Sequence, residues 1–264
     1  ASLEPWQTKK LNGIKNSGTI FAKDENHIIE KIVEYLKSNE DTKDESLNQE
    51  IRDTEDKLTS SLYSTISNLQ QTINDYDSRN ENAIFLMVGI QCIGKSTIFN
   101  EIMKNKKNII QCSADIFMGE FDASRLVECH KLCQKAVVEA IKNGFHAFVD
   151  NTNILAEHRS IYKTLSSLLN VDLVVVNVCG DYWLNCSKDT QVKTLNALEL
   201  RSKRREVKTG KVITRDVIER TMNNACNDFK KFSKISHEDA SSQDIVSWLD
   251  HFPTPTYIKG LSYF

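Results

Sequence analysis

One segment of the chain has the residue types and spacing that suit the binding of a triphosphate. It reads GIQCIGKST from Gly89 to Thr97, with Gly94, Lys95 and Ser96 at its end. The glycines let backbone N–H groups turn toward a phosphate, and the helix expected next adds the positive end of its dipole. The lysine can reach the β- and γ-phosphate oxygens, and the serine hydroxyl can ligate Mg²⁺. We therefore expect ATP or GTP with Mg²⁺ as cofactors, and the sequence leaves the choice of nucleotide open.

The context of this P-loop separates it from other nucleotide-binding motifs. It lies directly after the apolar run AIFLMVG and directly before a helical stretch, as the motif requires. A translation-factor-like GTPase would also carry DxxG and NKxD, but no later Gly has Asp three residues before it, and residues 105–108 read NKKN. A motor-type or transport ATPase would place a catalytic Glu after an acidic strand end, where residues 150–153 read DNTN. We expect neither class.

Transfer of the terminal phosphoryl group also needs a base and cations. Asp115 follows the second predicted strand, at the sheet edge where the P-loop opens, and is the candidate base. Its alternative role is that of a turn or N-cap residue. The basic segment RSKRREVKTGK, residues 201–211, is predicted as a kink between two helices that folds over the phosphates as a lid. The alternative for this segment is a solvated basic surface.

A series of motifs in this order resembles one group of enzymes. After the P-loop come SAD at 113–115, Cys-His at 129–130, Asn-Gly at 143–144, VDNTN at 149–153 and the basic segment LRSKRREVKTGKVITRDVI. Together they resemble the polynucleotide 5′-kinase group of P-loop phosphotransferases. That group includes the kinase domains of RNA-repair enzymes and tRNA ligases, and the P-loop part of 2′,3′-cyclic nucleotide phosphodiesterases. The resemblance covers about residues 83–231.

The resemblance implies a role for particular residues of this chain. Asp115 would be the general base, Arg201 or Arg204 the lid arginine, and Arg205 a further contact to the nucleotide. The residues that would hold the triphosphate and Mg²⁺ are Gly89, Gly94, Lys95, Ser96 and Thr97. The residues that would line the acceptor side are Asp150, Asn151, Thr152, Asn153 and Arg159.

Two departures from the group concern the acceptor. Some members have an acidic residue directly before the Thr-Asn pair, where this chain has Asn151. The phage-type kinase has an Arg three residues after its base to grip the acceptor phosphate, where this chain has Met118. The expected function is a kinase that moves the γ-phosphate to the 5′-hydroxyl of RNA or DNA, with RNA as the preferred partner. The alternatives are a zeta-toxin-like kinase of a small molecule and a nucleotide-binding or RNA-binding module without turnover.

The elements that must position these residues follow from hydrophobic patterning. Short apolar runs at 83–89, 108–114, 146–152 and 171–179 alternate with helical stretches at 96–105, 122–143 and 155–169. Such runs suit parallel strands buried on both faces, so the sequence predicts an α/β fold, a P-loop NTPase-type parallel sheet flanked by helices. We expect a helical N-terminal extension over 1–80, the kinase domain with a helical lid over 81–240, and a C-terminal helix and tail over 241–264.

One helix of the extension has an apolar stripe, formed by Leu58, Leu62, Ile66, Leu69 and Ile73. Its spacing of three and four residues puts the stripe on one face, which must be buried. We expect it to pack on this chain's own core, with a dimer or partner-domain contact through residues 58–73 as the alternative.

Composition limits the partners and the location. A formal net charge of −2 argues against coating long nucleic acid by charge, and leaves recognition of an end open. The seven Cys include no CxxC pair, which favours reduced thiols in a cytoplasmic protein. No apolar run approaches the roughly 20 residues that a membrane span needs. The chain begins with Ala1, which is consistent with a fragment of a longer polypeptide.

Overall fold

The computed structural model describes residues 25–119, 122–184, 186–209, 213–233 and 247–249, leaving aside the side chains of 25–44 and 207–209. The chain divides into two compact units, Ala1–Gln49 and Glu50–Phe264. The boundary falls inside helix α2 (Glu25–Arg79), earlier than the boundary at residue 80 that composition suggests. No helix of the described part is both long and apolar enough to cross a membrane.

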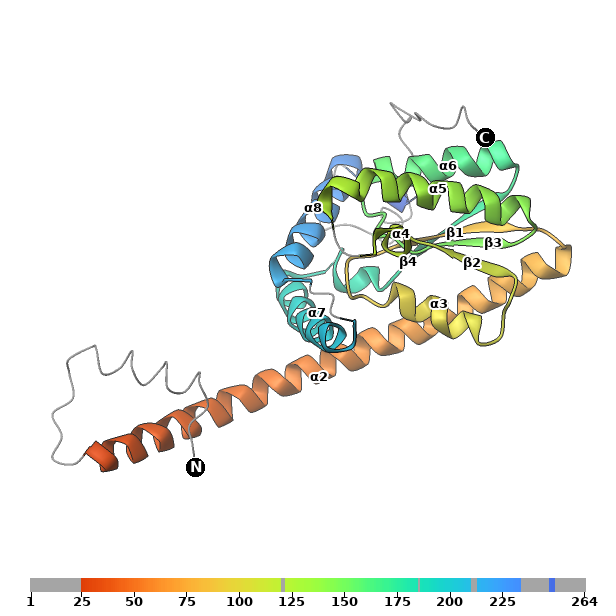
Figure 1. Ribbon diagram of the computed structural model, residues 1–264. Coiled ribbons are helices and arrows are strands. Elements are labelled where there is room, and N and C mark those ends of the chain that lie inside the picture. Colours follow the sequence, from red (N-terminus) through yellow and green to blue (C-terminus); the bar gives the residue numbers. More distant parts are fainter. Residues whose placement is uncertain (1–24, 120–121, 185, 210–212, 234–246, 250–264) are drawn as a thin grey trace. The chain divides into compact units, whose positions relative to one another are not determined.

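The second unit is built on a four-stranded parallel sheet with the strand order β2-β3-β1-β4 (Figure 1). Its strands are β1 (Ala83–Val88), β2 (Ile109–Cys112), β3 (His146–Val149) and β4 (Asp172–Asn177). All six residues of β1 are buried, because β1 lies between β3 and β4 and helices cover both of its faces. The predicted α/β class and the four predicted strands are confirmed.

Alternate residues of β1 enter two hydrophobic clusters, as the two-residue period of a strand requires. Ile84 and Leu86 join one cluster with side chains of α5 (Leu126–Lys142) and α6 (Ala156–Leu169). Phe85 and Met87 join the other with side chains of α3 (Lys95–Met103) and of α2 from residue 50 onward. Figure 1 shows α5 and α6 on one side of the sheet and α3 on the other.

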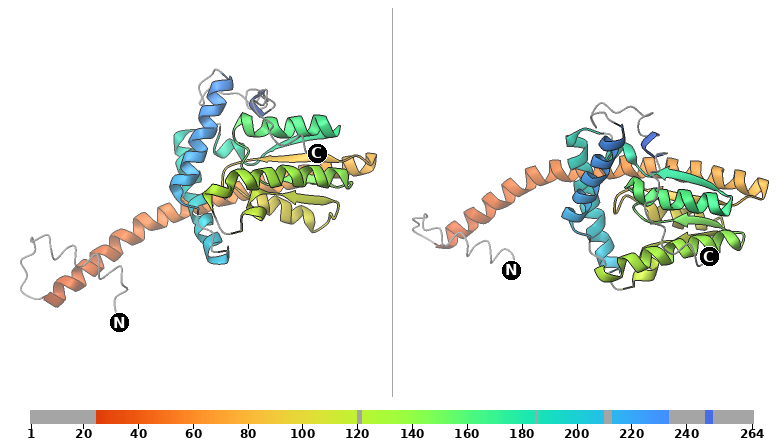
Figure 2. Two further views of the ribbon diagram at one scale, coloured as in Figure 1. Left: turned by 45° about the horizontal axis from the view of Figure 1, so that its top comes forward. Right: turned by 90° about the horizontal axis from the view of Figure 1, so that it is seen from above.

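Two long helices, α7 (Lys188–Thr209) and α8 (Arg215–Ser233), stand across the carboxyl ends of the strands (Figures 1 and 2). The basic residues 201–205 lie within α7, so the predicted kink at this place is wrong. The segment holds strong helix formers and no helix breaker before Gly210, and its charge carries no conformational signal. Within residues 241–264, where a C-terminal helix and tail are expected, residues 247–249 are helical and the others lie outside the described residues.

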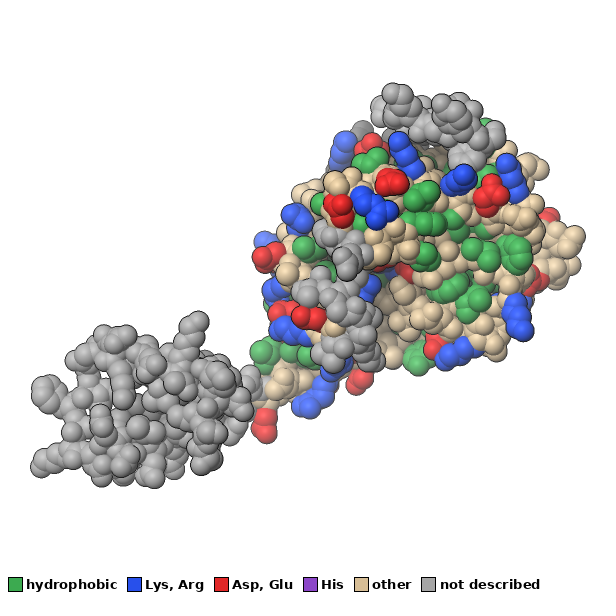
Figure 3. Space-filling view, in the orientation of Figure 1, with side chains coloured by type: hydrophobic (Ala, Val, Ile, Leu, Met, Phe, Trp, Pro, Cys, Tyr) green, Lys and Arg blue, Asp and Glu red, His purple; other side chains and the backbone are tan. Residues whose placement is uncertain are grey.

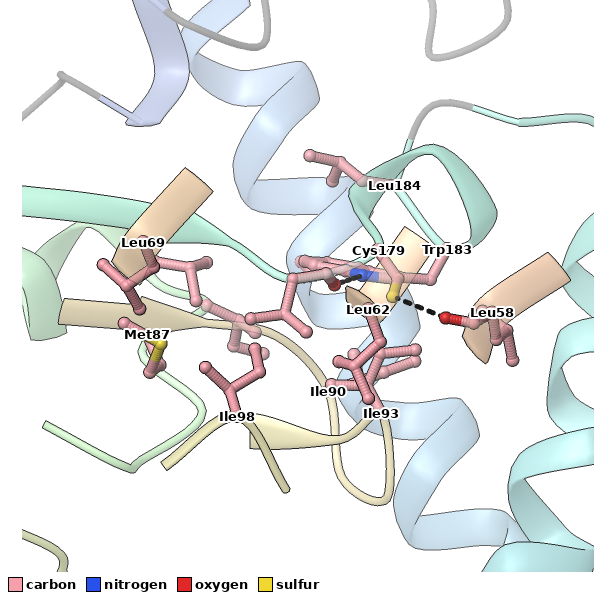
Figure 4. Packing of buried hydrophobic residues seen from close by; sticks show 14 of the residues in the cluster. Leu58, Leu62, Leu69, Met87, Ile90, Ile93, Ile98, Cys179, Trp183 and Leu184 are labelled. Atoms are coloured by element: carbon pink, nitrogen blue, oxygen red, sulfur yellow. Dashed lines mark hydrogen bonds between the residues drawn. The ribbon is translucent and has the colours of Figure 1, made fainter. Parts of the chain in front are cut away.

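The apolar stripe of α2 packs on the core of its own unit (Figure 4). Leu58 and Ile73 are fully buried, and the other three members of the stripe are at most 7% exposed. They contact the cluster that contains Met87, Ile90 and Ile98. Core packing of the stripe is therefore confirmed, and the alternative of a dimer or partner contact through it is wrong, because its apolar face is already covered.

Candidate active site

The P-loop connects β1 to α3 in the strand–loop–helix order that its sequence predicts. Gly94, the residue before α3, has a φ of 120°, which L side chains rarely adopt. A Cβ at this position would lie 2.8 Å from Leu62 Cδ1 of α2. Both the backbone conformation and the close approach of α2 therefore require glycine here.

Lys95 lies with its ammonium folded into the loop. Its Nζ donates hydrogen bonds to the carbonyl oxygens of Gly89 (2.9 Å) and Ile90 (2.8 Å). Burial lowers the pKa of this ammonium to about 8, and the nearby carboxylate of Asp150 opposes the shift. Two neutral backbone carbonyls therefore hold the lysine at the loop where we expect the triphosphate. A phosphate can replace these carbonyls as the acceptor of its hydrogen bonds.

Ser96 and Asp150 form a hydroxyl–carboxylate pair beside the loop. Ser96 Oγ donates to Asp150 Oδ2 at 2.6 Å, and Gln111 Nε2 donates to the same oxygen at 2.8 Å. Asp150 follows β3 directly, is 8% exposed, and is brought to the P-loop because β3 pairs with β1. A hydroxyl and a carboxylate are the oxygen ligands that hold Mg²⁺ in P-loop enzymes, so this donor set fits the ion. Thr97, the next residue of α3, is exposed.

The three residues that follow Asp150, namely Asn151, Thr152 and Asn153, were expected to line the acceptor side. In the structure each of them forms a hydrogen bond with the backbone of a neighbouring segment. Asn151 Oδ1 accepts from the backbone N of Ala114 (3.0 Å), and the carbonyl of Thr152 accepts from the N–H of Gly89 (2.9 Å). Asn153, 3% exposed with a φ of 48°, donates from Nδ2 to the carbonyl oxygen of Met87 (2.9 Å). These contacts join the end of β3 to the P-loop strand and to the Asp115 turn. Asn153 is buried, and its place on the acceptor side stays a prediction.

Asp115 lies in the first turn of the short helix α4 (Ala114–Met118). The N-cap is Ser113, whose Oγ accepts from the backbone N of Asp115 (3.3 Å) and donates to the carbonyl of Asp150 (2.9 Å). The cap is thus supplied by another residue, and the Asp115 side chain is 60% exposed at the carboxyl edge of the sheet. Its Oδ2 lies 3.8 Å from Arg205 Nη2 of α7.

Of the three arginines of α7, one pairs with Asp115 and two pair with Glu55. Arg205 reaches Asp115, and its charge also contributes to the lowered pKa of Lys95. Arg204 Nη1 lies 2.9 Å and 3.1 Å from the two carboxylate oxygens of Glu55 on α2. Arg201 Nε lies 3.6 Å from Glu55 Oε1. The arginine nearest the candidate base is therefore Arg205, although Arg201 and Arg204 were the expected lid arginines.

Arg159 does not line an acceptor surface, contrary to its expected place. Its side chain is fully buried, and its guanidinium lies 4.2 Å from the ring centroid of Trp248. It donates to the carbonyl oxygens of Ile154 (3.0 Å) and Trp248 (2.8 Å). Burial lowers the pKa of Arg159 to about 10, with Asp228 opposing the shift. The residue joins the start of α6 to the segment 247–249.

Sequence reasoning did not single out Glu55, Gln111 or Arg125, which contact Arg201, Asp150 and Met118 respectively. Gln111 lies on β2 and Glu55 just precedes the α2 stripe, so only the fold brings Gln111 to Asp150 and Glu55 to Arg201. Arg125, at the end of the short helix η1 (Ala123–Arg125), places its guanidinium 3.4 Å from the carbonyls of Phe117 and Met118. A basic residue shortly after the candidate base was the one signal that could have indicated it.

Comparison with known proteins gives distant likenesses. No family profile matches the sequence, and no curated protein matches it. A solved Pnkp1/Rnl/Hen1 RNA repair complex contains a chain 18% identical to this one, with 61% of this chain and 50% of that chain covered and a TM-score of 0.44. A second Pnkp1/Rnl/Hen1 complex gives 17% identity, 37% and 35% coverage, and a TM-score of 0.29. The matched part spans half or less of those chains, and similarity at this level does not define the activity of the protein.

Proposed function

We propose that the protein is an NTP- and Mg²⁺-dependent kinase that transfers the γ-phosphoryl group to the 5′-hydroxyl of a nucleic-acid end. One observation supports this above all: the P-loop lysine, the Ser96–Asp150 pair and the Asp115–Arg205 pair all lie at the carboxyl edge of one parallel sheet. Ligands of open α/β sheets bind at this edge. A module that only binds nucleotide has no need of an exposed carboxylate beside a lid arginine.

Each group has a role in transfer. Lys95 and the backbone N–H groups of the loop bind the β- and γ-phosphates. Ser96 and Asp150 would hold Mg²⁺, which would neutralise phosphate charge. The acceptor oxygen forms a bond to the γ-phosphorus as the bond from that phosphorus to the β,γ-bridging oxygen breaks. Asp115 accepts the proton of the hydroxyl, and the nucleoside diphosphate leaves. Arg205 stabilises the negative charge on the moving group.

The acceptor side follows from the surroundings of Asp115. Met118, which stands where the phage-type kinase has an acceptor-gripping arginine, is 4% exposed. Arg125 supplies a guanidinium at the carbonyls of Phe117 and Met118, and we assign it the contact to the first acceptor phosphate. On the face of the sheet unit in Figure 3, Lys and Arg side chains are interspersed with Asp and Glu, which suits recognition of an end.

The test is transfer of label from γ-labelled ATP and GTP, with Mg²⁺, to RNA and DNA oligonucleotides of one sequence bearing a 5′-hydroxyl or a 5′-phosphate. We expect label on the 5′-hydroxyl oligonucleotides only. Arg125→Ala should raise the KM for oligonucleotide and leave that for nucleotide unchanged, with Arg79→Ala, at the opposite end of β1, as the control. Nucleotide binding without label on any oligonucleotide would refute the acceptor assignment and favour a small-molecule acceptor.

A further inference from the structure

Glu55 of α2 forms ion pairs with two of the arginines of α7. No motif of the sequence indicates this role. The Glu55 side chain is 15% exposed and pairs with Arg204 and with Arg201 Nε. Arg201 Nη2 also donates to the backbone carbonyl of Glu55 (3.4 Å) and to Thr59 Oγ1 (3.3 Å), one turn further along α2. The guanidinium of Arg201 is thus held against α2 by two hydrogen bonds and by the charge of the Glu55 carboxylate.

The other end of the same guanidinium contacts the P-loop. Arg201 Nη1 donates to the carbonyl oxygen of Ile93 at 3.4 Å. In a trans peptide the C=O and the following N–H point in opposite directions, and the described part of the chain has no cis peptide. Holding the Ile93 carbonyl toward Arg201 therefore fixes the orientation of the Gly94 N–H, which points the opposite way. The Gly94 N–H is one of the backbone N–H groups that we expect to turn toward the phosphate.

We propose that Glu55 is a positioning residue of the nucleotide site, which acts through Arg201 on the Ile93–Gly94 peptide. The proposal rests on the proposed function, because it assumes that this loop binds the triphosphate. Arg201 is then a brace between α2 and the P-loop. Its charge, 19% exposed on the side chain, is compensated by Glu55, which keeps the guanidinium at the loop before nucleotide arrives. Leu62 of the same α2 face packs against Gly94 and supports the loop beside the brace.

The test measures the affinity of the full chain for Mg-ATP and Mg-GTP, together with thermal stability, in Glu55→Gln. We expect the Kd for both nucleotides to rise about tenfold, which is the effect of losing one charge-assisted contact. The matched control is Glu199→Gln, which removes a carboxylate of α7 paired with Lys203 and Arg215 and should leave the Kd unchanged. A purely structural role for Glu55 would lower Tm and leave the Kd, measured well below Tm, unaltered.

A double-mutant cycle tests whether Glu55 acts through Arg201. In an Arg201→Met background, Glu55→Gln should cause no further loss of nucleotide affinity, because the brace is already absent. Additive losses would overturn the proposal. If Glu55→Gln does not fold, Thr59→Val removes a single acceptor of Arg201 and should still raise the Kd, and an unchanged Kd there would contradict the brace. Lack of nucleotide binding by the wild-type chain would refute the proposed function, whereas equal binding by wild type and Glu55→Gln would refute this inference alone.

Discussion

At the scale of single residues, Asp150 is the carboxylate closest to the expected Mg²⁺ ligand Ser96, with 2.6 Å between Oδ2 and Oγ. Asp150→Asn keeps the size and the hydrogen-bonding oxygen but removes the charge that would hold the ion. We expect transfer to fall by roughly two to three orders of magnitude and its Mg²⁺ requirement to rise. A Mg²⁺ titration of label transfer measures both.

The control for Asp150 is Asp172→Asn, at the start of β4, which removes a carboxylate bonded to Tyr76 far from the P-loop. It should leave the Mg²⁺ requirement of transfer as it is. If Asp150→Asn keeps full activity at low Mg²⁺, Asp150 is a structural partner of Ser96 and holds no metal.

Arg159→Met should act on stability. The variant loses hydrogen bonds to the buried carbonyls of Ile154 and Trp248 and the contact with the Trp248 ring. We expect the free energy of unfolding to fall by about 2 to 4 kcal/mol, measured by urea unfolding. The ratio of the KM for oligonucleotide to the KM for nucleotide should not change. A selective loss of oligonucleotide use at unchanged stability would restore the acceptor role that the sequence suggested.

The strand–loop–helix setting of the P-loop was predictable because the motif is local: its residues follow one another in the chain between β1 and α3. The roles within VDNTN were not, because each side chain acts on a distant residue. Asp150 meets Ser96 across 54 positions, and Asn153 meets Met87 across 66. Only the pairing of β3 with β1 determines these partners, and residue types alone carry no record of that pairing.

At the scale of elements, the end of α2 is fastened to the sheet by Asp77. Its carboxylate accepts hydrogen bonds from His146 Nε2 (3.1 Å), Lys106 and Asn108, while His146 Nδ1 accepts from the backbone N of Ala83 (3.1 Å). Burial by itself would raise the pKa of Asp77, but the hydrogen bonds from Lys106, His146 and Asn108 lower it overall.

A carboxyl group with a lowered pKa in the folded state stabilises the protein above its unfolded pKa, near 3.8, and loses this effect as pH falls. We expect Asp77→Asn to reduce the free energy of unfolding by roughly 1 to 2 kcal/mol at pH 7. The difference from wild type should shrink below pH 4. Urea unfolding at pH 7 and pH 3 tests this, with Asp75→Asn, exposed on the same turn, as the control. An equal difference at both pH values would contradict the assignment.

The strands and most helices were predictable from periodicity, because buried strands read as apolar runs and amphipathic helices repeat every three to four residues. The end of α7 was not. A cluster of Arg and Lys suggested a kink, yet Arg201, Ser202 and Arg205 continue the helix because Leu195, Ala197 and Leu198 bury its earlier turns in the core. The charge of these residues does not determine the conformation of their backbone, which is helical.

At the scale of the whole molecule, residues 50–79 belong to the same compact unit as the sheet. A fragment of residues 50–264 should therefore fold cooperatively, and a fragment of residues 81–264 should not. Removal of the α2 stripe exposes the side of β1 that carries Phe85 and Met87. Burial of each stripe side chain stabilises the fold by about 1.5 to 3 kcal/mol. The total stability of a domain is about 5 to 15 kcal/mol, so loss of the whole stripe is enough to unfold it. Thermal unfolding by circular dichroism distinguishes the two. Cooperative unfolding of the 81–264 fragment would show that α2 is dispensable.

The sequence placed the domain boundary at residue 80 because composition and periodicity change there. It could show that the stripe of α2 must be buried, but not that the partner is the sheet face beside the P-loop. That partner depends on Phe85 and Met87 pointing to one side of β1 while Ile84 and Leu86 point to the other.

The central claim is that Asp115 takes the proton of a hydroxyl during phosphoryl transfer, and single-turnover transfer by Asp115→Asn tests it most directly. The measurement uses γ-labelled nucleotide, Mg²⁺ and a 5′-hydroxyl oligonucleotide, with nucleotide affinity determined on the same preparation. We predict that the rate of transfer falls by roughly two to four orders of magnitude while nucleotide affinity changes little. A loss of less than tenfold, with nucleotide bound as in wild type, would contradict the account.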